Sequence, residues 1–304
     1  MAAPVVVPEQ PMVRISKERS RFWRAPMLES LPLKLSVLVI CILWTLPTAG
    51  LLVTSVRNPL LITQTGWWEG LVNMFAPDQW TFANYEQVMG DVGMGAAFLN
   101  SLIVTIPSTV IPITIAAFAA YAFAWIPFRG RGILFIIVVA LLVVPIQMTL
   151  IPILKIYSGA SLYGSFVGIW LAHTAFGLPL AIFLLYNFIS QLPRDLFESA
   201  SIDGASAFQT FIRIVLPLSV PALGAFAIFQ FLWVWNDLLV ALVFLGPGGD
   251  VSVMPTQLFL MLGPYGGSWH LLTAGAFVTM VVPLIVFLAL QRFFVRGILA
   301  GSVK

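Results

Sequence analysis

The sequence predicts an all-α integral membrane protein with six transmembrane helices and both termini in the cytoplasm. Three observations carry this prediction: the composition, the length of the apolar segments and the distribution of the basic residues. Of the 304 residues, 60% are hydrophobic and only 9% are charged, whereas soluble globular proteins carry about 25% charged residues. A bilayer, unlike water, can solvate the apolar outer faces that such a composition creates.

The composition also excludes other classes of protein. The formal net charge is only +3, and the basic residues are scattered, so no basic patch for nucleic acid is present. The single cysteine, Cys41, lies in an apolar segment and predicts neither an intrachain disulfide nor a metal cluster. We expect this chain to bind no metal and no cofactor, because it contains no G-x-x-x-x-G-K-S/T motif for ATP and no H-E-x-x-H motif.

The chain divides into a cytoplasmic N-terminal tail, residues 1–33, and a transmembrane domain, residues 34–304. Six apolar segments are each long enough to cross a hydrocarbon core about 30 Å thick. We place them at residues 34–56, 96–125, 133–155, 163–190, 218–245 and 271–293. The second and fourth are long and are expected to tilt or to extend beyond the core. The third should break near Pro145 and Pro152, because proline lacks the amide hydrogen that a helix uses.

The basic residues indicate the orientation of these spans. Cytoplasmic loops carry an excess of Lys and Arg near the ends of spans. With the N-terminus inside, thirteen of the fifteen basic residues become cytoplasmic, and only Arg57 and Lys155 lie outside. Both termini are therefore predicted to be cytoplasmic.

This orientation makes residues 57–95 the longest external loop. The loop contains the aromatic residues Trp67, Trp68, Trp80, Phe82 and Tyr85 among several acids. Such side chains commonly form a belt at the membrane interface. The alternative is a docking surface for an external partner, and the sequence leaves both interpretations open.

The cytoplasmic segment 193–217, between the fourth and fifth spans, has the signals of a helix, a tight turn and a second helix. Pro193 suits the first position of a helix, where its missing amide hydrogen costs nothing. Gly204 lies where this helix should stop, since glycine adopts the left-handed conformation without penalty. Ser206 and Gln209 have the spacing of a capping box that starts the second helix. The segment therefore predicts an amphipathic helical hairpin.

Such a hairpin could lie on the lipid surface, pack against its own bundle or contact a cytoplasmic protein. A helix bound to the anionic lipid surface should be rich in Lys and Arg. This segment instead offers Asp195, Glu198 and Asp203 against Arg194 and Arg213. Internal packing or contact with a protein is therefore favoured.

The same segment resembles the EAA loop of ATP-binding-cassette (ABC) importer permeases, which reads E-A-A-x-x-D-G-A and, about ten residues later, I-x-L-P. The matching residues here are Glu198-Ser199-Ala200, Asp203-Gly204-Ala205, Ile214 and Leu216-Pro217. The spacing matches throughout. The one departure is Ser199 in place of the central alanine, and serine is small enough to preserve the packing of the helix.

The resemblance extends from about residue 30 to the C-terminus and is to carbohydrate-uptake permeases related to the smaller membrane subunit of the maltose system. It also rests on Asn100-Ser101-Leu102, on Ala119-Ala120-Tyr121-Ala122, on Trp235-Asn236-Asp237 and on the tail from Leu290 to Lys304. It implies the MetI-like permease fold, a bacterial or archaeal cytoplasmic membrane and the import of a sugar. The implied partners are a second permease subunit, two ATPase subunits that bind ATP and Mg, an extracytoplasmic sugar-binding protein and the lipid bilayer.

In that family the EAA helix inserts into a cleft of the ATPase subunit. The resemblance therefore implies that the coupling residues are Glu198, Ser199, Ala200, Asp203, Gly204 and Ala205. Glu198 is expected to pair with a basic group of the ATPase, and an ordinary solvated charge is the alternative. Asp203 has the alternative role of capping the turn.

A second set of candidate residues lies in the fifth span. An Asp at the centre of a membrane helix costs about 2.5–3.5 kcal/mol, so Asp237 should face the bundle or an aqueous path. The functional interpretation is a substrate path formed by Gln230, Trp233, Asn236 and Asp237, with Trp233 or Trp235 as stacking faces. The alternative is an interhelical hydrogen bond or a cap near a kink.

Other polar and small residues favour structural roles. His173 and His270 have no neighbouring carboxylate in the sequence and predict neither a metal site nor a catalytic dyad. The alanines at 116, 119, 120 and 124 form a small-residue face that lets helices approach closely.

The leading hypothesis is the permease subunit of an ABC importer for an oligosaccharide or α-glucoside, which is not itself an enzyme. Residues 254–257 and 269–273 are similar to the α-glucoside branch of these permeases. The alternative is a stand-alone secondary transporter that uses Asp237 for ion coupling. Such a transporter should show internal repeats and more intramembrane ionisable groups, and the sequence shows no convincing repeat between its halves.

Overall fold

The computed structural model describes residues 31–263 and 268–302, and the side chains among them as far as residue 289. The predicted N-terminal tail as far as residue 30 lies outside the described residues, as do residues 303 and 304 of the C-terminal tail. The elements are α1 Leu31–Ser55, α2 Pro59–Ile62, α3 Trp67–Val72, η2 Pro77–Gln79, α4 Ala83–Met89, α5 Met94–Trp125, α6 Arg131–Ala140, η3 Leu141–Val143, α7 Ile146–Gly159, α8 Phe166–Ile189, α9 Arg194–Ile202, α10 Ala207–Thr210, η4 Phe211–Val215, α11 Leu216–Trp235, α12 Leu239–Phe244, α13 Met254–Leu262 and α14 Trp269–Ser302.

Within the described residues the fold is helical, and the single β-bridge, between Arg57 and Trp80, is isolated. In the same part of the chain, five helices are long and apolar enough to cross a membrane, and a sixth span results if α6 and α7 together form one. The predicted all-α membrane class is confirmed. The described residues divide into two units, before and after the boundary between Gly50 and Leu51, and the packing below concerns the second unit.

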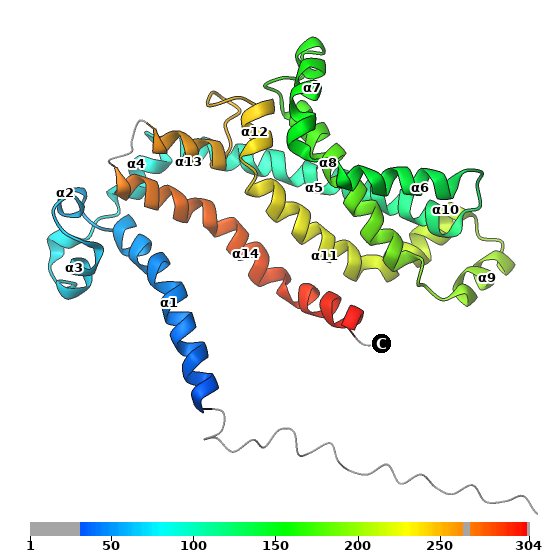
Figure 1. Cartoon of the computed structure of the whole chain (residues 1–304), viewed down its shortest axis with the longest axis horizontal. Helices are drawn as coiled ribbons and strands as arrows, with labels where there is room; N and C mark the ends of the chain where they lie inside the picture. The colour runs from blue at the N-terminus through cyan, green and yellow to red at the C-terminus, as the bar shows by residue number, and fades with distance from the viewer. Residues whose placement is uncertain (1–30, 264–267, 303–304) are drawn as a thin grey trace, which may run out of the picture. The chain divides into compact units, whose positions relative to one another are not determined.

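The second unit is organised around α5. This helix lies along α8, while α11 packs against both and also against α14 (Figure 1). The predicted small-residue face supports the close approach: Ala116 and Ala120 are fully buried, and Ala119 and Ala124 pack against the same core. The alanine face therefore packs within this chain.

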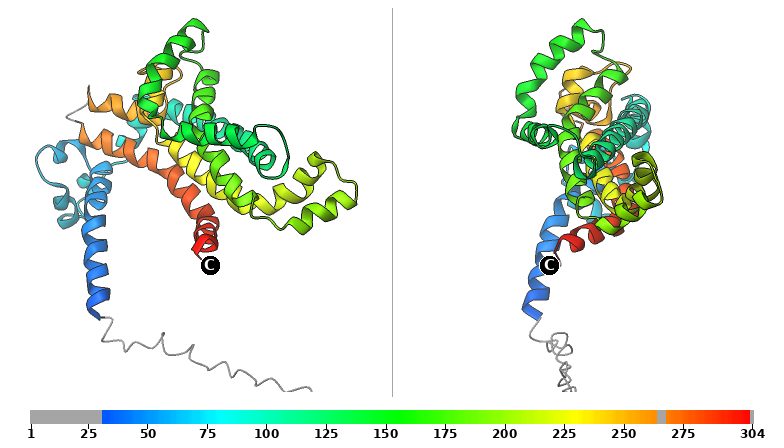
Figure 2. Two further views of the ribbon diagram at one scale, coloured as in Figure 1. Left: turned by 45° about the vertical axis from the view of Figure 1, so that its right-hand side comes forward. Right: turned by 90° about the vertical axis from the view of Figure 1, so that its right-hand side faces the viewer.

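The loops of this unit gather at opposite ends of α5. Both views show α4 and α13 near its N-terminal end and the hairpin of α9 and α10 near its C-terminal end (Figures 1 and 2). The predicted external segments that contain α4 and α13 thus lie at one end, and the predicted cytoplasmic hairpin lies at the other. This arrangement agrees with the orientation expected from the basic residues.

The third predicted span is a bent pair of helices. The axes of α6 with η3 and of α7 form an angle of 103°. The bend falls at Pro145, as predicted, because Pro145 is extended at ψ 126° and forms the N-cap of α7. Pro152 lies inside α7 without ending it, so the predicted break is located at Pro145.

The fifth predicted span, residues 218–245, is wrong at both ends. One span runs from Ala207 to Trp235, so the second arm of the hairpin is the beginning of the membrane helix. The helix passes Pro217 through a π-helical turn at Phe211–Val215, a local widening that accommodates a residue unable to donate a backbone hydrogen bond. At the other end the chain breaks before α12.

The external loop 57–95 folds around Arg57, whose side chain is 1% exposed. Its guanidinium donates to Gln79 Oε1 at 3.0 Å, to the Gly66 carbonyl at 2.6 Å and to the hydroxyl of Thr65. Asn84 closes the loop by donating to the Arg57 carbonyl at 2.9 Å. Arg57 is an exception to the cytoplasmic bias of the basic residues because its buried side chain holds the external loop together. Trp68 and Phe82 remain exposed, so the interfacial belt and the docking surface both stay predictions.

A second external segment, before and within α13, is anchored to α5. Asn100 Nδ2 donates to the carbonyls of Asp250 at 2.7 Å and Ser252 at 2.9 Å, and Ser101 Oγ accepts from the Met254 amide at 2.8 Å. Gln257 donates to the Val92 carbonyl. Several residues that carry the sequence resemblance therefore fix the external ends of the helices.

Candidate coupling loop and translocation path

The coupling loop begins with α9, which ends in a closed turn at Gly204. Asp203 is the C-cap residue of α9. The next residue, Gly204, adopts the left-handed conformation with φ +72°. The Ala205 amide donates to the Ala200 carbonyl at 2.9 Å, and the Gly204 amide donates to the Ser201 carbonyl at 3.1 Å. These two bonds form a Schellman motif, which satisfies the last carbonyls of a helix and favours glycine at the left-handed position.

The turn explains the spacing of the motif. Ala200 is 6% exposed, and Ala205, which follows the glycine, is half-buried. These are the two positions whose contact usually accompanies a Schellman motif. Asp203 occupies the C-cap position of α9 through its backbone, and both predicted roles of its side chain, the ATPase contact and the cap of the turn, stay predictions.

The predicted capping box at the start of α10 is confirmed. The Ser206 amide donates to Gln209 Oε1 at 2.8 Å, and the Gln209 amide donates to Ser206 Oγ at 3.3 Å. Because α10 continues through η4 into α11, this box fixes the cytoplasmic end of a membrane-spanning helix. A displacement of the hairpin would therefore pass directly into the fifth span.

An aromatic stack holds α9 against the membrane domain. Phe197 stacks on Trp125 at the end of α5, with ring centroids 3.6 Å apart and an interplanar angle of 17°. The indole of Trp125 donates to the Ile189 carbonyl at the end of α8, at 2.9 Å. One side of α9 is thus tied to two spans, and the other side is free for a cytoplasmic partner.

The remaining coupling residues lie on the exposed part of α9. Ser199 Oγ donates to the Asp195 carbonyl at 2.8 Å, so the hydroxyl is satisfied within the helix and does not alter the packing that an alanine would have. Glu198 is exposed and, among the described residues, has no ion-pair partner. Its pairing with an ATPase stays a prediction.

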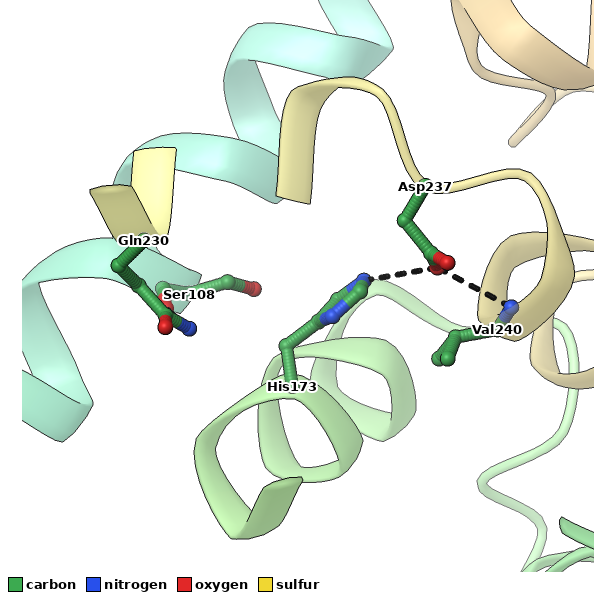
Figure 3. A network of polar contacts seen from close by, with 5 residues as sticks. All are labelled: Ser108, His173, Gln230, Asp237 and Val240. Atoms are coloured by element: carbon green, nitrogen blue, oxygen red, sulfur yellow. Dashed lines mark hydrogen bonds and ion pairs between the residues drawn. The ribbon is translucent and has the colours of Figure 1, made fainter. Parts of the chain in front are cut away.

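Of the predicted path residues, Gln230 is fully buried. Its Nε2 donates to the Ser108 carbonyl of α5 at 3.2 Å, and Figure 3 shows both residues close to His173. On the other side, Gly177 of α8 leaves the room that Gln230 occupies: a Cβ added at Gly177 would lie 2.7 Å from the amide of Gln230. Gln230 is therefore the point at which α5, α8 and α11 meet.

Gln230 and Trp233 also line one cavity of about 220 Å³. Its other walls include Phe176 and Gly177 of α8 and Leu142 and Val144 at the break of the third span. The lining is mostly apolar and the volume is below the range of about 300–1,000 Å³ that is usual for ligand pockets. The cavity is open to the surface, because Leu142 and Val144 in its lining are exposed, and its role in a substrate path stays a prediction.

Asn236 and Asp237 lie in the break between α11 and α12, and not inside a helix as the sequence predicted. Asn236 Nδ2 donates to the Leu232 carbonyl at 2.7 Å, which caps α11. Asp237 Oδ2 accepts from the Val240 amide at 3.0 Å, which caps α12. The alternative interpretation of Asp237, a cap near a kink, describes its observed contact. Trp235 is 1% exposed and donates to the Thr279 carbonyl at 3.0 Å, so it offers no stacking face.

The expectation that His173 has no carboxylate neighbour is wrong. Nε2 of His173 lies 3.7 Å from Oδ2 of Asp237, and the two side chains point toward one another from α8 and from the break (Figure 3). The indole of Trp233 contacts the same imidazole edge-to-face, with ring centroids 5.5 Å apart. A polar residue such as His173 in an apolar span indicates that a polar partner is present. The sequence does not identify Asp237 as that partner, because the two residues are far apart along the chain.

The described residues hold no group of His, Cys, Asp and Glu suited to a metal ion. The arrangement offers a hairpin that is rigidly joined to spans and a polar cluster where α5, α8 and α11 meet. These features suit the transmission of movement through the bundle.

Comparison with known proteins gives one matching family, described as binding-protein-dependent transport system inner membrane component, over residues 112–300. The chain is 54% identical over 289 residues to the osmoprotective compounds uptake permease protein GgtD of Synechocystis sp., with 95% of each chain covered. It is 45% identical to the alpha-glucoside transport system permease protein AglG of Rhizobium meliloti, with 89% of this chain and 96% of the relative covered.

A solved structure matches the fold. The chain superposes with a TM-score of 0.68 on a chain of a bacterial ABC transporter involved in the import of the acidic polysaccharide alginate. The two are 20% identical, and the match covers 87% of this chain and 95% of the other. The fold predicted from the resemblance is confirmed.

Proposed function

Because the chain belongs to the family of binding-protein-dependent transport system inner membrane components, we propose that it carries a glucoside across the membrane. Members of this family are permease subunits of ABC importers, in which a separate ATPase hydrolyses ATP. The chain is such a permease and not an enzyme. Family membership excludes the alternative of a stand-alone secondary transporter driven by Asp237.

The substrate class is inferred from two relatives. The one named for alpha-glucosides and the one named for osmoprotective compounds are both more than 40% identical along nearly the whole chain. An α-glucoside of low molecular mass that serves as an osmoprotectant or as a carbon source would belong to both of the substrate classes for which these relatives are named. This is the substrate that we propose.

The coupling hairpin is the observation that carries the mechanism. ATP, with Mg, binds to a partner ATPase, whose movement displaces α9. The Schellman turn at Gly204 keeps α9 rigid relative to α10, and α10 continues into the fifth span. The displacement therefore reaches Gln230, where α11 meets α5 and α8, and changes how these three helices pack around the substrate path.

The proposed assembly contains this chain, a second permease subunit, two ATPase subunits and an extracytoplasmic binding protein that delivers the glucoside. One of the solved neighbours is itself a complex with a substrate-bound periplasmic protein, which supports the last of these partners. The proposed location is the cytoplasmic membrane of a bacterium or archaeon. Glu198 and Gly204 are the residues that we expect at the ATPase contact.

The test is uptake by the whole importer in proteoliposomes. The complex is reconstituted with ATP inside, and uptake of labelled maltose, trehalose and sucrose is compared with that of labelled arabinose. We expect ATP-dependent uptake of at least one α-glucoside and none of arabinose. Glu198→Lys and Gly204→Asp should abolish uptake or uncouple it from ATP hydrolysis.

The matched control is Asp250→Lys, the same reversal of charge on an exposed acid at the external end, which should leave coupling intact. Uptake that persists without any ATPase would contradict the coupling mechanism. Uptake of arabinose in preference to every α-glucoside would contradict the substrate class alone.

A further inference from the structure

A polar pocket of about 440 Å³ lies directly behind the coupling helix. Four of its lining residues, Arg194, Phe197, Glu198 and Ser201, come from α9. They are spaced three and four residues apart and so form one stripe along the helix. The pocket therefore lies between α9 and the membrane domain, and Glu198, which is exposed, lines its open side.

The other walls of the pocket are the cytoplasmic ends of three membrane helices. Trp125 is the last residue of α5, Arg131 is the first of α6, and Ser190 caps α8. Because these spans end at the cytoplasmic surface, the pocket lies at the level of the lipid head groups. Tryptophan is enriched at this level.

The pocket has an excess of positive charge. Arg131 and Arg194 oppose Glu198, so the three charges sum to +1. Among the described residues, neither Arg194 nor Glu198 has an ion-pair partner. Arg131 makes one long hydrogen bond, of 3.5 Å, to the Ile126 carbonyl. Guanidinium groups bind phosphate oxygens in pairs of parallel hydrogen bonds, and no other bond to these two groups is seen within the part of the chain that the structure describes.

Stacked aromatic side chains form one wall of the pocket, and this wall is rigid before any ligand binds. Trp125 and Phe197 are stacked, and the indole is hydrogen-bonded to the end of α8. The arginines therefore converge from α6 and α9 onto a rigid apolar surface, which suits the glycerol and upper acyl carbons of a lipid. Helix α9 as a whole has more acidic than basic residues. The residues that line the pocket have more basic than acidic ones, because Arg131 of α6 adds a second positive charge.

We propose that this pocket binds the phosphate of an anionic phospholipid from the cytoplasmic leaflet, with Arg131 and Arg194 as its hydrogen-bond donors. Basic pockets between transmembrane helices on the cytoplasmic side bind lipid head groups in this way. A phosphate that bridges the two arginines ties α9 to α6. Glu198 opposes the bound anion and limits its affinity.

The test measures binding of phosphatidylglycerol to the full chain in detergent by native mass spectrometry over a titration. We expect Arg131→Gln and Arg194→Gln each to weaken binding about fivefold, the effect of one basic group near a membrane surface. Glu198→Gln should strengthen binding, because it removes the opposing charge. Arg129→Gln, an exposed arginine two residues from Arg131, is the matched control and should change nothing.

Two further titrations identify the ligand. Diacylglycerol, which lacks the phosphate, should bind all variants equally. Inorganic phosphate at the same concentration should not displace phosphatidylglycerol. Displacement by inorganic phosphate would overturn the lipid as the source, and equal effects of Arg129→Gln and Arg194→Gln would overturn the pocket itself. The thermal unfolding midpoint of each variant confirms that the chain is folded.

Discussion

Nε2 of His173 lies 3.7 Å from Oδ2 of Asp237, across the space between α8 and the break that separates α11 from α12. The imidazole is 1% exposed and the carboxylate side chain 11%. Beside them is a cavity of about 10 Å³, lined in part by Ser101 and Thr105, which is about the size of one water molecule. The pair therefore joins the external part of the fifth span to the fourth.

This relationship predicts an energetic coupling between the two side chains. Asp237→Ala removes the cap of α12 and leaves His173 without its nearest polar neighbour, and we expect a loss of about 1–3 kcal/mol of stability. Asp237→Asn keeps an oxygen for the Val240 amide and should cost less. A double-mutant cycle with His173→Ala, measured by unfolding in detergent, should give a coupling of about 0.5–3 kcal/mol.

The control for this cycle is Asp250→Ala, which truncates an exposed acid in the loop between α12 and α13. It should leave the unfolding midpoint unchanged. Additive effects of the His173 and Asp237 variants would show that the two residues act independently, contrary to the structure.

At Gly204, the backbone conformation and not a steric clash should determine which substitutions are tolerated. A Cβ at this position would have nothing within 4 Å, but φ is +72°. Gly204→Ala should therefore cost about 1–2 kcal/mol, the penalty for an L-residue in the left-handed conformation. Gly204→Asn should cost less, because asparagine visits this conformation more readily.

A matched control is Gly132→Ala in α6, where a Cβ also meets nothing but the backbone is helical. We expect it to be neutral or to stabilise the chain by about 0.4–1 kcal/mol. Unfolding in detergent reports both values. If both alanine variants behaved alike, the left-handed turn after α9 would not exist in the protein.

Gly177 should be intolerant of alanine for the opposite reason. Its backbone is helical, but a Cβ would lie 2.7 Å from the buried amide of Gln230. Overpacking of this kind costs about 1–3 kcal/mol, and the clash should separate α8 from α11. Gln230→Ala introduced into the Gly177→Ala chain should restore part of the stability, because it removes the clashing atoms.

Gly224→Ala on α11, where a Cβ meets nothing within 4 Å, is the control and should be tolerated. The readout is the unfolding midpoint in detergent together with uptake by the reconstituted importer. A Gly177→Ala chain as stable as the Gly224→Ala chain would contradict the close approach of α8 and α11.

Arg57 should determine whether the external loop is folded. Arg57→Met removes the donors to Gln79, Thr65 and Gly66 and leaves the buried Gln79 oxygen unpaired, at about 1–3 kcal/mol. We expect residues 57–95 to become sensitive to limited proteolysis while the spans stay protected. Arg129→Met, a change at an exposed arginine, should leave the proteolytic pattern as it is.

Much of the coupling loop could be predicted from the sequence because its determinants are local. Gly204 stops a helix and Ser206 with Gln209 starts the next through bonds between residues three to five apart in sequence. The extent of the fifth span could not be predicted in this way. Apolar composition continues past Trp235, and only the packing of Asp237 against His173 and Val240 shows where the helix ends.

The sequence by itself determined the all-helical membrane class, the expected orientation and the chemistry of the hairpin, since composition, charge bias and capping act over short distances along the chain. The tertiary structure decided which polar residues meet: His173 with Asp237, Gln230 with Gly177, and Arg57 with Gln79. It also brought Arg131 and Arg194 to one pocket. These residues are far apart in sequence, and their proximity depends on how the helices pack.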